Sequence, residues 1–561
     1  MKKTIQHIVF CSFVLLGLLG CDKYLDIVPD KTQEVSLMFQ RKEAAYPALV
    51  TCYSYLPQND GLYATFTLAS DELTTPLAKE PNSIKLMKGQ QVADNPIMSF
   101  WSGYGASGRG QGSLWDGIRA CNTLIANIDQ ALDMTQVEKN TWKAEATVLK
   151  AYYHFLLLNY YGPIPIVDVN LPIDASDEEL RVHRNTVDEV VNYILNTLDL
   201  SISDLPERVT GSNDLGRMDQ VIAHAIKSKV SLYAASPLFN GNSEFYSDFL
   251  NHEGIHFFNQ NNEISKWETA AIAAEDAIAA ALAQGAELYK YTGSVPSHDQ
   301  SNFQYTTIRT LYDIKYSIVD KWNSEVLWGD SNPVNDWWRL QSGALMKDPT
   351  ASSVQAAWQW VAPTMRMAEL YYTENGLPID EDLMHDFSDK FSTVRVSSSQ
   401  KMYALPGLTT AKLHLHREPR FYSSIGFDSG QYRAWGELWN LRMKKGQTHG
   451  RIANSSDYLI TGFSLKKLVH PDSEGDAYDK LIRYPWPNAR LAELYLNYAE
   501  AVNEAYGPSQ AVYDALNVVR SRAGIPDVEV VWSDGNLAKN VTKPTTQSGL
   551  REIIRPPRMI E

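Results

Sequence analysis

The sequence predicts a mainly α-helical protein in which helix pairs stack into a curved solenoid beside an irregular, loop-rich subdomain. Three observations support this fold class. Long stretches have apolar residues at helical spacing, and Gly-Pro pairs end them. Between residues 285 and 480 this helical spacing gives way to an irregular, aromatic-rich sequence. A helix pair of this kind cannot bury its apolar face alone, so neighbouring pairs are expected to pack on one another.

The longest single helix is expected over residues 142–161, which contain neither glycine nor proline. Gly162-Pro163 follows directly, as a C-terminal glycine and a proline should at the end of a helix. The apolar residues of this helix form one stripe, made by Val148, Tyr152, Phe155 and Leu156. Trp115 and Trp142 lie in such stripes and are expected in the core. Further helices are expected at 112–130, 186–203, 219–236 and 265–283.

A complete helix pair is predicted at residues 489–523, with Gly507-Pro508-Ser509 as its turn. Its length is close to the roughly 34 residues of a tetratricopeptide unit, and small Ala499 lies where two helices must approach closely. The apolar positions are Leu491, Leu494, Tyr495, Tyr498 and Val502 in one helix, and Ala511, Ala515, Leu516 and Val519 in the next.

Residues 285–480 are aromatic-rich and interrupted by Gly, Ser and Asn, with few long periodic helices. This texture indicates an irregular subdomain packed on the helical one, with short β-hairpins around 323–329 and 458–466. Tryptophans are dense in this stretch, among them Trp337, Trp338, Trp358 and Trp360.

The N-terminal residues predict export and lipid attachment. Lys2 and Lys3 precede an apolar run that is too short to span a membrane, which is typical of a signal peptide over residues 1–20. The run closes with a small residue and then Cys21, as in a lipoprotein box, so Cys21 is expected to be the acylated residue. Two or more acyl chains would anchor the protein stably.

These boundaries divide the chain into five parts. After the signal peptide we expect the lipidated cysteine and an extended tether at 21–40, a helical region at 41–284, the irregular subdomain at 285–480, and a C-terminal helical repeat at 481–561.

The net charge limits the classes of partner, and the cysteine content leaves two structural alternatives. The formal net charge of -15 argues against nucleic acid as a partner, because phosphate binding needs a basic face. Beyond the signal region only Cys52 and Cys121 remain, and they are either a disulfide or two buried thiols.

Two motifs match the patterns of a zinc site and of a dinucleotide-binding site, but the residues around them do not favour the secondary structure that such sites need. His252-Glu253-Gly254-Ile255-His256 fits the zinc pattern H-E-x-x-H, yet a glycine in its middle and flanking asparagines favour a solvated loop. Residues 103–108 fit G-x-G-x-x-G, but they follow no convincing strand and favour a surface loop. No nucleophile elbow is present. The sequence therefore gives no positive signal for an enzyme.

Several segments, in this order, resemble the SusD-like (RagB/SusD) family over nearly the whole chain. They are Cys21-Asp22-Lys23-Tyr24-Leu25-Asp26, Tyr160-Tyr161-Gly162-Pro163-Ile164-Pro165, Leu232-Tyr233-Ala234-Ala235-Ser236-Pro237, Asn323-Ser324-Glu325-Val326, Gly376-Leu377-Pro378-Ile379-Asp380, Arg417-Glu418-Pro419-Arg420-Phe421, Arg490-Leu491-Ala492-Glu493 and Val519-Arg520-Ser521-Arg522-Ala523-Gly524. Members of this family usually continue into motifs resembling LAFEG and DLRRW. Here Pro556-Pro557 come first and the sequence ends at Glu561, so the repeat looks truncated. We expect the last helix to be broken or displaced, because proline inside a helix costs about 3 kcal/mol or more.

The resemblance implies a SusD-like fold and a lipoprotein on the cell-surface side of the outer membrane. It implies that the protein binds oligosaccharide or polysaccharide without catalysis and delivers it to a TonB-dependent, SusC-like transporter. No cofactor is expected, and whether a structural calcium ion is bound stays open. Two alternatives stay open as well: a structural lid or scaffold of the transporter that binds no sugar, and a surface metallohydrolase. The glycan itself cannot be named from the sequence.

A sugar-binding site needs exposed aromatic rings as platforms and polar groups that orient the hydroxyls. A neutral hydrogen bond contributes about 0.5–1.5 kcal/mol, whereas micromolar affinity needs about 8 kcal/mol, so several contacts must act together on an oligosaccharide. The resemblance to the family implies a site on the surface, and the candidate sugar-binding residues there are Asp71, Trp101, Tyr104, Arg109, Trp337 and Trp338.

Overall fold

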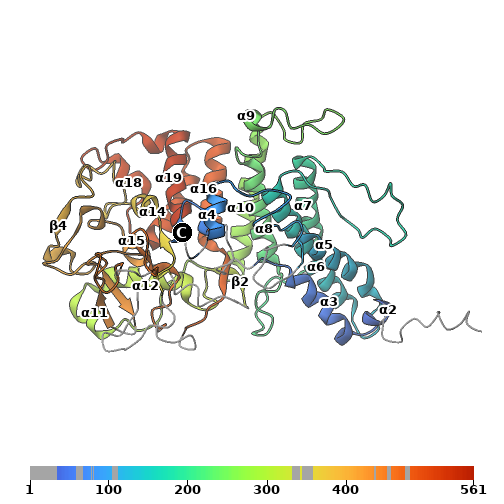
Figure 1. Ribbon diagram of the computed structural model, residues 1–561, viewed down its shortest axis with the longest axis horizontal. Coiled ribbons are helices and arrows are strands. Elements are labelled where there is room, and N and C mark those ends of the chain that lie inside the picture. Colours follow the sequence, from blue (N-terminus) through green and yellow to red (C-terminus); the bar gives the residue numbers. More distant parts are fainter. Residues whose placement is uncertain are drawn as a thin grey trace, which may run out of the picture.

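The computed structural model describes residues 35–57, 67–76, 79, 81–103, 112–331, 342–343, 358–434, 437–451, 456–473 and 481–561. Within them the protein is mainly helical, with short two-stranded sheets (Figure 1). The first half contains α2 (Val35–Met38), α3 (Lys42–Ser54), α4 (Pro81–Met87), α5 (Leu114–Asn127), α6 (Gln136–Tyr161), α7 (Val187–Ile202), α8 (Gln220–Ala235), α9 (Ser243–Tyr246) and α10 (Ile264–Ala283). The second half contains α11 (Ser297–Asn302), α12 (Tyr305–Val319), α14 (Met365–Leu370), α15 (Pro419–Ser424), α16 (Leu491–Tyr506), α17 (Gln510–Arg522), α18 (Val528–Ser533) and α19 (Gln547–Ile560).

Local signals in the sequence set the ends of the long helices. At the start of α6, the Thr135 hydroxyl accepts a hydrogen bond from the Glu138 amide at 3.3 Å, and the Glu138 carboxylate accepts one from the Thr135 amide at 2.8 Å. This capping box satisfies amides that have no partner within the helix. Gly162, at φ +70°, ends the helix. The helix predicted over 142–161 is confirmed, and it begins earlier than predicted, at Gln136.

The helices stack in chain order, and the C-terminal pair continues the stack. α5 packs on α6, α6 on α7, α7 on α8, and α8 on α10. α16 then packs against α10 and turns at Gly507, φ +80°, into α17 (Figure 1). Leu491 and Leu494 join the core of the first-half helices, whereas Leu496 and Val502 face a second core made with α17–α19. The predicted stack of helix pairs is confirmed. None of the described helices has the length and apolarity needed to cross a bilayer.

Close approach of α5 and α6 depends on Gly117. A Cβ at this position would lie 2.9 Å from the ring of Tyr153 and 2.9 Å from Cβ of Tyr55. We expect Gly117→Ala to lower the free energy of unfolding by about 1–3 kcal/mol, because overpacking outweighs the better helix propensity of alanine. Urea unfolding measures this loss. Gly535→Ala, where the new Cβ would meet its nearest atom at 3.8 Å, should leave stability nearly unchanged.

Two strand pairs join segments of the second half that are far apart in the chain. β2 (Val326–Asp330) pairs with β10 (Trp486–Arg490), and β6 (Ile425–Gly426) pairs with β9 (Ser464–Leu465), each antiparallel. The local hairpins predicted around 323–329 and 458–466 are therefore wrong, although strands do occur there. Alternation of apolar residues signals a strand but does not identify its partner. The other pairs are β1 (Leu73–Thr74) with β3 (Ala362–Pro363), β4 (Thr393–Arg395) with β5 (Thr409–Ala411), and β7 (Gln431–Ala434) with β8 (Glu437–Asn440).

The end of the predicted tether belongs to the folded body. Residues 35–38 form α2, and Phe39 is fully buried in the core of the first-half helices. The Leu132 amide donates to the Gln40 carbonyl at 3.0 Å. An extended tether up to residue 40 is therefore wrong for residues 35–40, because Phe39 supplies an apolar anchor that outweighs the polar residues around it. Cys21 and residues 21–34 lie outside the described residues.

The last helix is not broken by its prolines, which corrects the prediction. α19 runs through Pro556 and Pro557. Pro557 has no N–H for the Ile553 carbonyl, but the Tyr372 hydroxyl donates to that carbonyl at 3.0 Å and replaces the missing bond. The apolar face of α19 is also buried, with Ile554 1% exposed, so tertiary packing offsets the cost of the prolines.

Cys52 and Cys121 are two buried thiols in the structure, which is one of the two alternatives that the sequence left open. The Cys52 thiol donates to the Ala48 carbonyl at 3.3 Å. Burial raises the pKa of Cys121 well above its usual value, and its contact with Cys52 raises it further.

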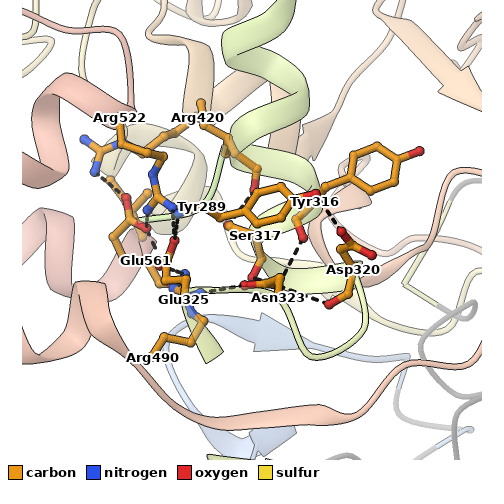
Figure 2. Close-up of polar contacts among 12 residues, drawn as sticks. Tyr289, Tyr316, Ser317, Asp320, Asn323, Glu325, Arg420, Arg490, Arg522 and Glu561 are labelled. Carbon is orange, nitrogen blue, oxygen red and sulfur yellow. Dashed lines mark hydrogen bonds and ion pairs between the residues drawn. The ribbon is translucent and has the colours of Figure 1, made fainter. Parts of the chain in front are cut away.

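A buried ion-pair network joins the subdomain to the C-terminal helices (Figure 2). The Glu325 carboxylate accepts hydrogen bonds from Arg490 and Arg522, both at 2.7 Å, and is fully buried. Arg522 and Arg420 also contact Glu561. Burial opposes the ionisation of Glu561, but Arg522, Arg420 and Arg490 outweigh it and lower the pKa of this carboxyl overall. Segments that carry the family resemblance thus meet in one cluster.

Candidate functional site

The segment around Asp71 lies beside the strand that follows Trp360. In the β1–β3 pair, Leu73 faces Pro363 and Thr74 faces Ala362. Just beyond it, the Thr364 amide donates to the Glu72 carbonyl at 2.9 Å, and the Thr364 hydroxyl donates to the Asp71 carbonyl at 2.5 Å. The Asp71 residue itself is exposed. This pairing places an exposed carboxylate a few residues along the strand from two tryptophans.

Trp358 and Trp360 form a half-buried ring pair, with centroids 4.8 Å apart and planes tilted by 45°. Gln359 between them has φ +61°, a left-handed conformation that is costly for a residue with a side chain. Such strain persists only where the surroundings impose it, and it is often found at ligand sites. We call Trp358, Trp360 and the two charged groups that hold them, Lys79 and Asp457, the tryptophan surface.

Charged groups from two other segments fix the inner ring. The Asp457 carboxylate accepts a hydrogen bond from the Trp360 indole N–H at 2.7 Å and pairs with Lys79 at 2.5 Å. The Lys79 ammonium also lies 4.5 Å from the Trp360 ring centroid, a cation–π distance. Trp360 packs against the core of the subdomain. The Trp360 ring is therefore anchored to the subdomain, and Trp358 contacts it from the neighbouring position.

Trp101 belongs to a different packing group. Its ring meets Trp115 edge-on at 5.0 Å and Tyr161 at 5.5 Å, and its amide donates to the Tyr161 hydroxyl at 3.1 Å. It is half-buried against the core of the first-half helices, whereas Leu73 near Asp71 belongs to the core of the subdomain. Four other predicted site residues lie outside the described residues: Tyr104, Arg109, Trp337 and Trp338.

Trp115 and Trp142 were expected in the core. Trp142 is 5% exposed, and Trp115 is half-buried against the same cluster. Both lie on first-half helices, and neither belongs to the tryptophan surface.

None of the four members of the tryptophan surface was predicted as a site residue from the sequence. Trp358 and Trp360 were noted for their density but not placed in the site, and their W-x-W spacing was the available signal. Lys79 and Asp457 carry no local signal, because only the fold brings these distant segments together.

A second feature that the sequence did not predict is a cavity of about 250 Å³ lined by tyrosines and lysines. Tyr312 and Tyr316, one turn apart on α12, stack at 5.9 Å along its wall. Burial, together with a smaller effect of the nearby Arg433, lowers the pKa of Lys466 to about 7. A partly enclosed cavity of this size suits a small molecule better than a long chain.

The H-E-x-x-H motif lies in an exposed loop rather than on a helix. Gly254 has φ +79°, and Leu250 forms an isolated β-bridge with His256. The side chain of His252 is 70% exposed. The expected solvated loop is confirmed, and the helical face that would bring two imidazoles onto one zinc ion is missing. Of the G-x-G-x-x-G stretch only Gly103 lies within the described residues.

Comparison with protein families matches both halves of the chain. Residues 324–561 match the family described as SusD family, and residues 23–232 match the one described as "Starch-binding associating with outer membrane". The chain belongs to the SusD/RagB family. The expected family and the expected SusD-like fold are thus confirmed. A search of curated proteins gave no match.

Solved structures agree with this assignment. BT4246 is 28% identical, with a TM-score of 0.76, over 93% of this chain and 86% of its own. The SusD-like protein BF3747 from Bacteroides fragilis is 19% identical, with a TM-score of 0.62, over 93% and 84%. The SusD-like carbohydrate binding protein BF0978 from the same species is 17% identical, with a TM-score of 0.56, over 93% and 84%. The last two show the fold alone.

Membership has direct consequences for this SusD-like protein. The family consists of glycan-binding, non-catalytic proteins, and it is associated with the outer membrane. The prediction that the chain is not an enzyme is confirmed by this membership, and the metallohydrolase alternative loses its support.

Proposed function

We propose that this protein captures oligosaccharide on the tryptophan surface and delivers it, unaltered, to a TonB-dependent, SusC-like transporter. In this proposal a lipid on Cys21 anchors the protein on the cell-surface side of the outer membrane. The observation that carries the proposal is the Trp358–Trp360 pair, held at the surface by Asp457 and Lys79. The description of BF0978, which has the same fold, as a carbohydrate binding protein also supports it.

Sugar rings have apolar C–H faces ringed by hydroxyls, and the tryptophan surface offers both kinds of partner. An aromatic ring contributes about 0.5–1.5 kcal/mol by stacking, by analogy with aromatic pairs, and each hydrogen bond contributes a similar amount. Two rings and two charged groups fall short of the roughly 8 kcal/mol of a micromolar complex. We therefore propose that the ligand is an oligosaccharide that also reaches the remaining candidates, which are Asp71, Trp101, Tyr104, Arg109, Trp337 and Trp338.

Replacing Trp358 by alanine tests the site. We expect affinity for an oligosaccharide to fall about tenfold, which corresponds to about 1.4 kcal/mol and to the loss of one stacking ring. The melting temperature should change little, because Trp358 is only half-buried. Isothermal titration with a panel of oligosaccharides and differential scanning calorimetry measure the two effects.

Tyr506 provides a matched control, because it is an aromatic residue on α16 that is 63% exposed. Tyr506→Ala should leave both affinity and melting temperature unchanged. Unchanged affinity in Trp358→Ala, with wild-type binding intact, would place the glycan elsewhere on the molecule.

The lid or scaffold alternative makes a different prediction. If the wild-type protein binds no member of the panel but co-purifies with its transporter, the protein acts as a structural lid. If it binds sugars and co-purifies, both parts of the proposal hold. Labelling with a fatty acid, which should be lost in Cys21→Ser, tests the anchor.

A further inference from the structure

Two histidines and a glutamate from three separate segments converge in the subdomain. Oε1 of Glu374 lies 3.1 Å from Nε2 of His385 and 2.8 Å from Nδ1 of His416. The two imidazole rings stack, with centroids 4.4 Å apart and planes 21° from parallel. One ligating atom from each residue lies within 4.8 Å of the other two. Among the described residues, no other trio of His, Cys, Asp or Glu meets this criterion.

Backbone contacts hold Glu374 and His416 in place. Thr373 and Arg417 form an isolated antiparallel bridge, and the Glu374 amide donates to the His416 carbonyl at 3.0 Å. The Glu374 and His416 backbones are therefore fixed opposite each other. His416 has φ +57°, a left-handed conformation that is costly for a residue with a side chain.

The third segment is fixed by Asp382. Its carboxylate accepts hydrogen bonds from the Thr373 hydroxyl at 2.6 Å and from the Asn375 side chain at 3.0 Å. It also accepts one from the Met384 amide at 2.8 Å. The residues that precede His385 are thus tied to the strand that carries Glu374.

We propose that Glu374, His385 and His416 bind a divalent transition-metal ion of the zinc class. Zn²⁺ takes imidazole nitrogens at about 2.0–2.1 Å and carboxylate oxygens at about 2.0–2.2 Å, which sets neighbouring ligand atoms of a tetrahedron about 3.3–3.5 Å apart. The two nitrogen–oxygen distances here fall within about half an ångström of that value. One imidazole offers Nε2 and the other Nδ1, and both nitrogens serve as zinc ligands.

In the structure one nitrogen of each imidazole faces the same oxygen of Glu374. A divalent ion bound there takes the place of any proton between these atoms and is held by the neutral rings.

The cluster is open to solvent. The side chains of Glu374 and His416 are 40% and 39% exposed, and that of His385 is 20% exposed. Gln400 approaches Nδ1 of His416 only at 3.5 Å, so it does not close the site. Three protein ligands and a water molecule are the arrangement of an open zinc site.

Zinc titration of the full chain, purified without a histidine tag, tests the site. We expect one ion per chain by isothermal titration and by metal analysis. With Co²⁺ as a probe, we expect the visible absorption bands of a tetrahedral site. Glu374→Gln and His385→Gln are conservative changes at partly exposed positions. Loss of a residue that only supports a metal ligand weakens binding by about 10- to 100-fold. Loss of a ligand itself should therefore weaken zinc binding by about 100-fold or more.

His252→Gln is the matched control, because His252 is also an exposed histidine with a neighbouring glutamate, Glu253, at 3.8 Å. Its zinc affinity should equal that of the wild type. Absence of saturable binding in the wild type, or full affinity in Glu374→Gln, would overturn the proposal. Trp358→Ala should bind zinc normally, so failure of the glycan proposal and failure of the metal proposal are distinguishable.

Discussion

Glu325→Gln is expected to lower the free energy of unfolding by about 3–5 kcal/mol. Glu325 is fully buried and is the shared partner of Arg490 and Arg522, each at 2.7 Å. Its carboxylate also accepts the Tyr289 amide at 3.0 Å. Glutamine leaves two buried guanidinium groups without this counter-charge, and removing one partner of a buried ion pair has this magnitude of effect. Urea unfolding followed by tryptophan fluorescence measures the shift of the transition midpoint.

Glu369→Gln is the control for this change. Glu369 pairs with Lys390 at 2.8 Å, but both side chains are partly exposed, at 30% and 28%. Its loss should cost less than about 1 kcal/mol, because solvent screens such a pair. Equal effects of the two substitutions would mean that the buried network contributes no more than a surface pair, contrary to the expectation.

Arg417→Met is expected to cost about 3 kcal/mol or more. The Arg417 side chain is 1% exposed, and its guanidinium donates to backbone carbonyls from two segments. These acceptors are the carbonyls of Leu413 at 2.9 Å, Ala368 at 2.8 Å, Tyr372 at 3.3 Å, and Tyr371. Methionine fills similar volume but leaves these carbonyls unsatisfied, and each buried unsatisfied group costs about 1–3 kcal/mol. Burial lowers the pKa of Arg417 to about 10, so the group stays charged at neutral pH.

Calorimetry of Arg417→Met and of Arg366→Met, an exposed arginine on α14, separates burial from loss of charge. Arg366→Met should melt at the wild-type temperature. A stable Arg417→Met protein would show that water or a shift of the chain can satisfy the carbonyls instead.

Both predictions concern residues that the sequence marked as family-like without saying what they do. Glu325, Arg417, Arg490 and Arg522 lie in short segments far apart in the chain. In the structure, Glu325, Arg490 and Arg522 converge on one buried cluster, and Arg417 ties the segment before α15 to the one after α14. The resemblance therefore reflects how the subdomain is joined to the helical stack.

The candidate glycan-binding residues illustrate the limit of reasoning from residue type. Trp101 is one of the predicted platforms, and its half-buried ring packs edge-on against Trp115 and Tyr161. Exposure cannot be read from the identity of a tryptophan, since the same ring stabilises a core or a ligand. Lys79 and Asp457, which hold Trp360, were not predicted at all.

The sequence by itself determined the long helices of the stack and most of their ends, because periodic apolar residues, capping boxes and glycines such as Gly162 and Gly507 act within a few residues of the chain. Tertiary structure alone decided the rest. The partner of β2, the survival of α19 through Pro557, and the meeting of Glu374 with His385 and His416 depend on contacts between distant segments. Such contacts produce no periodic pattern in the sequence, because they join residues that are far apart in the chain and meet only in the complete fold.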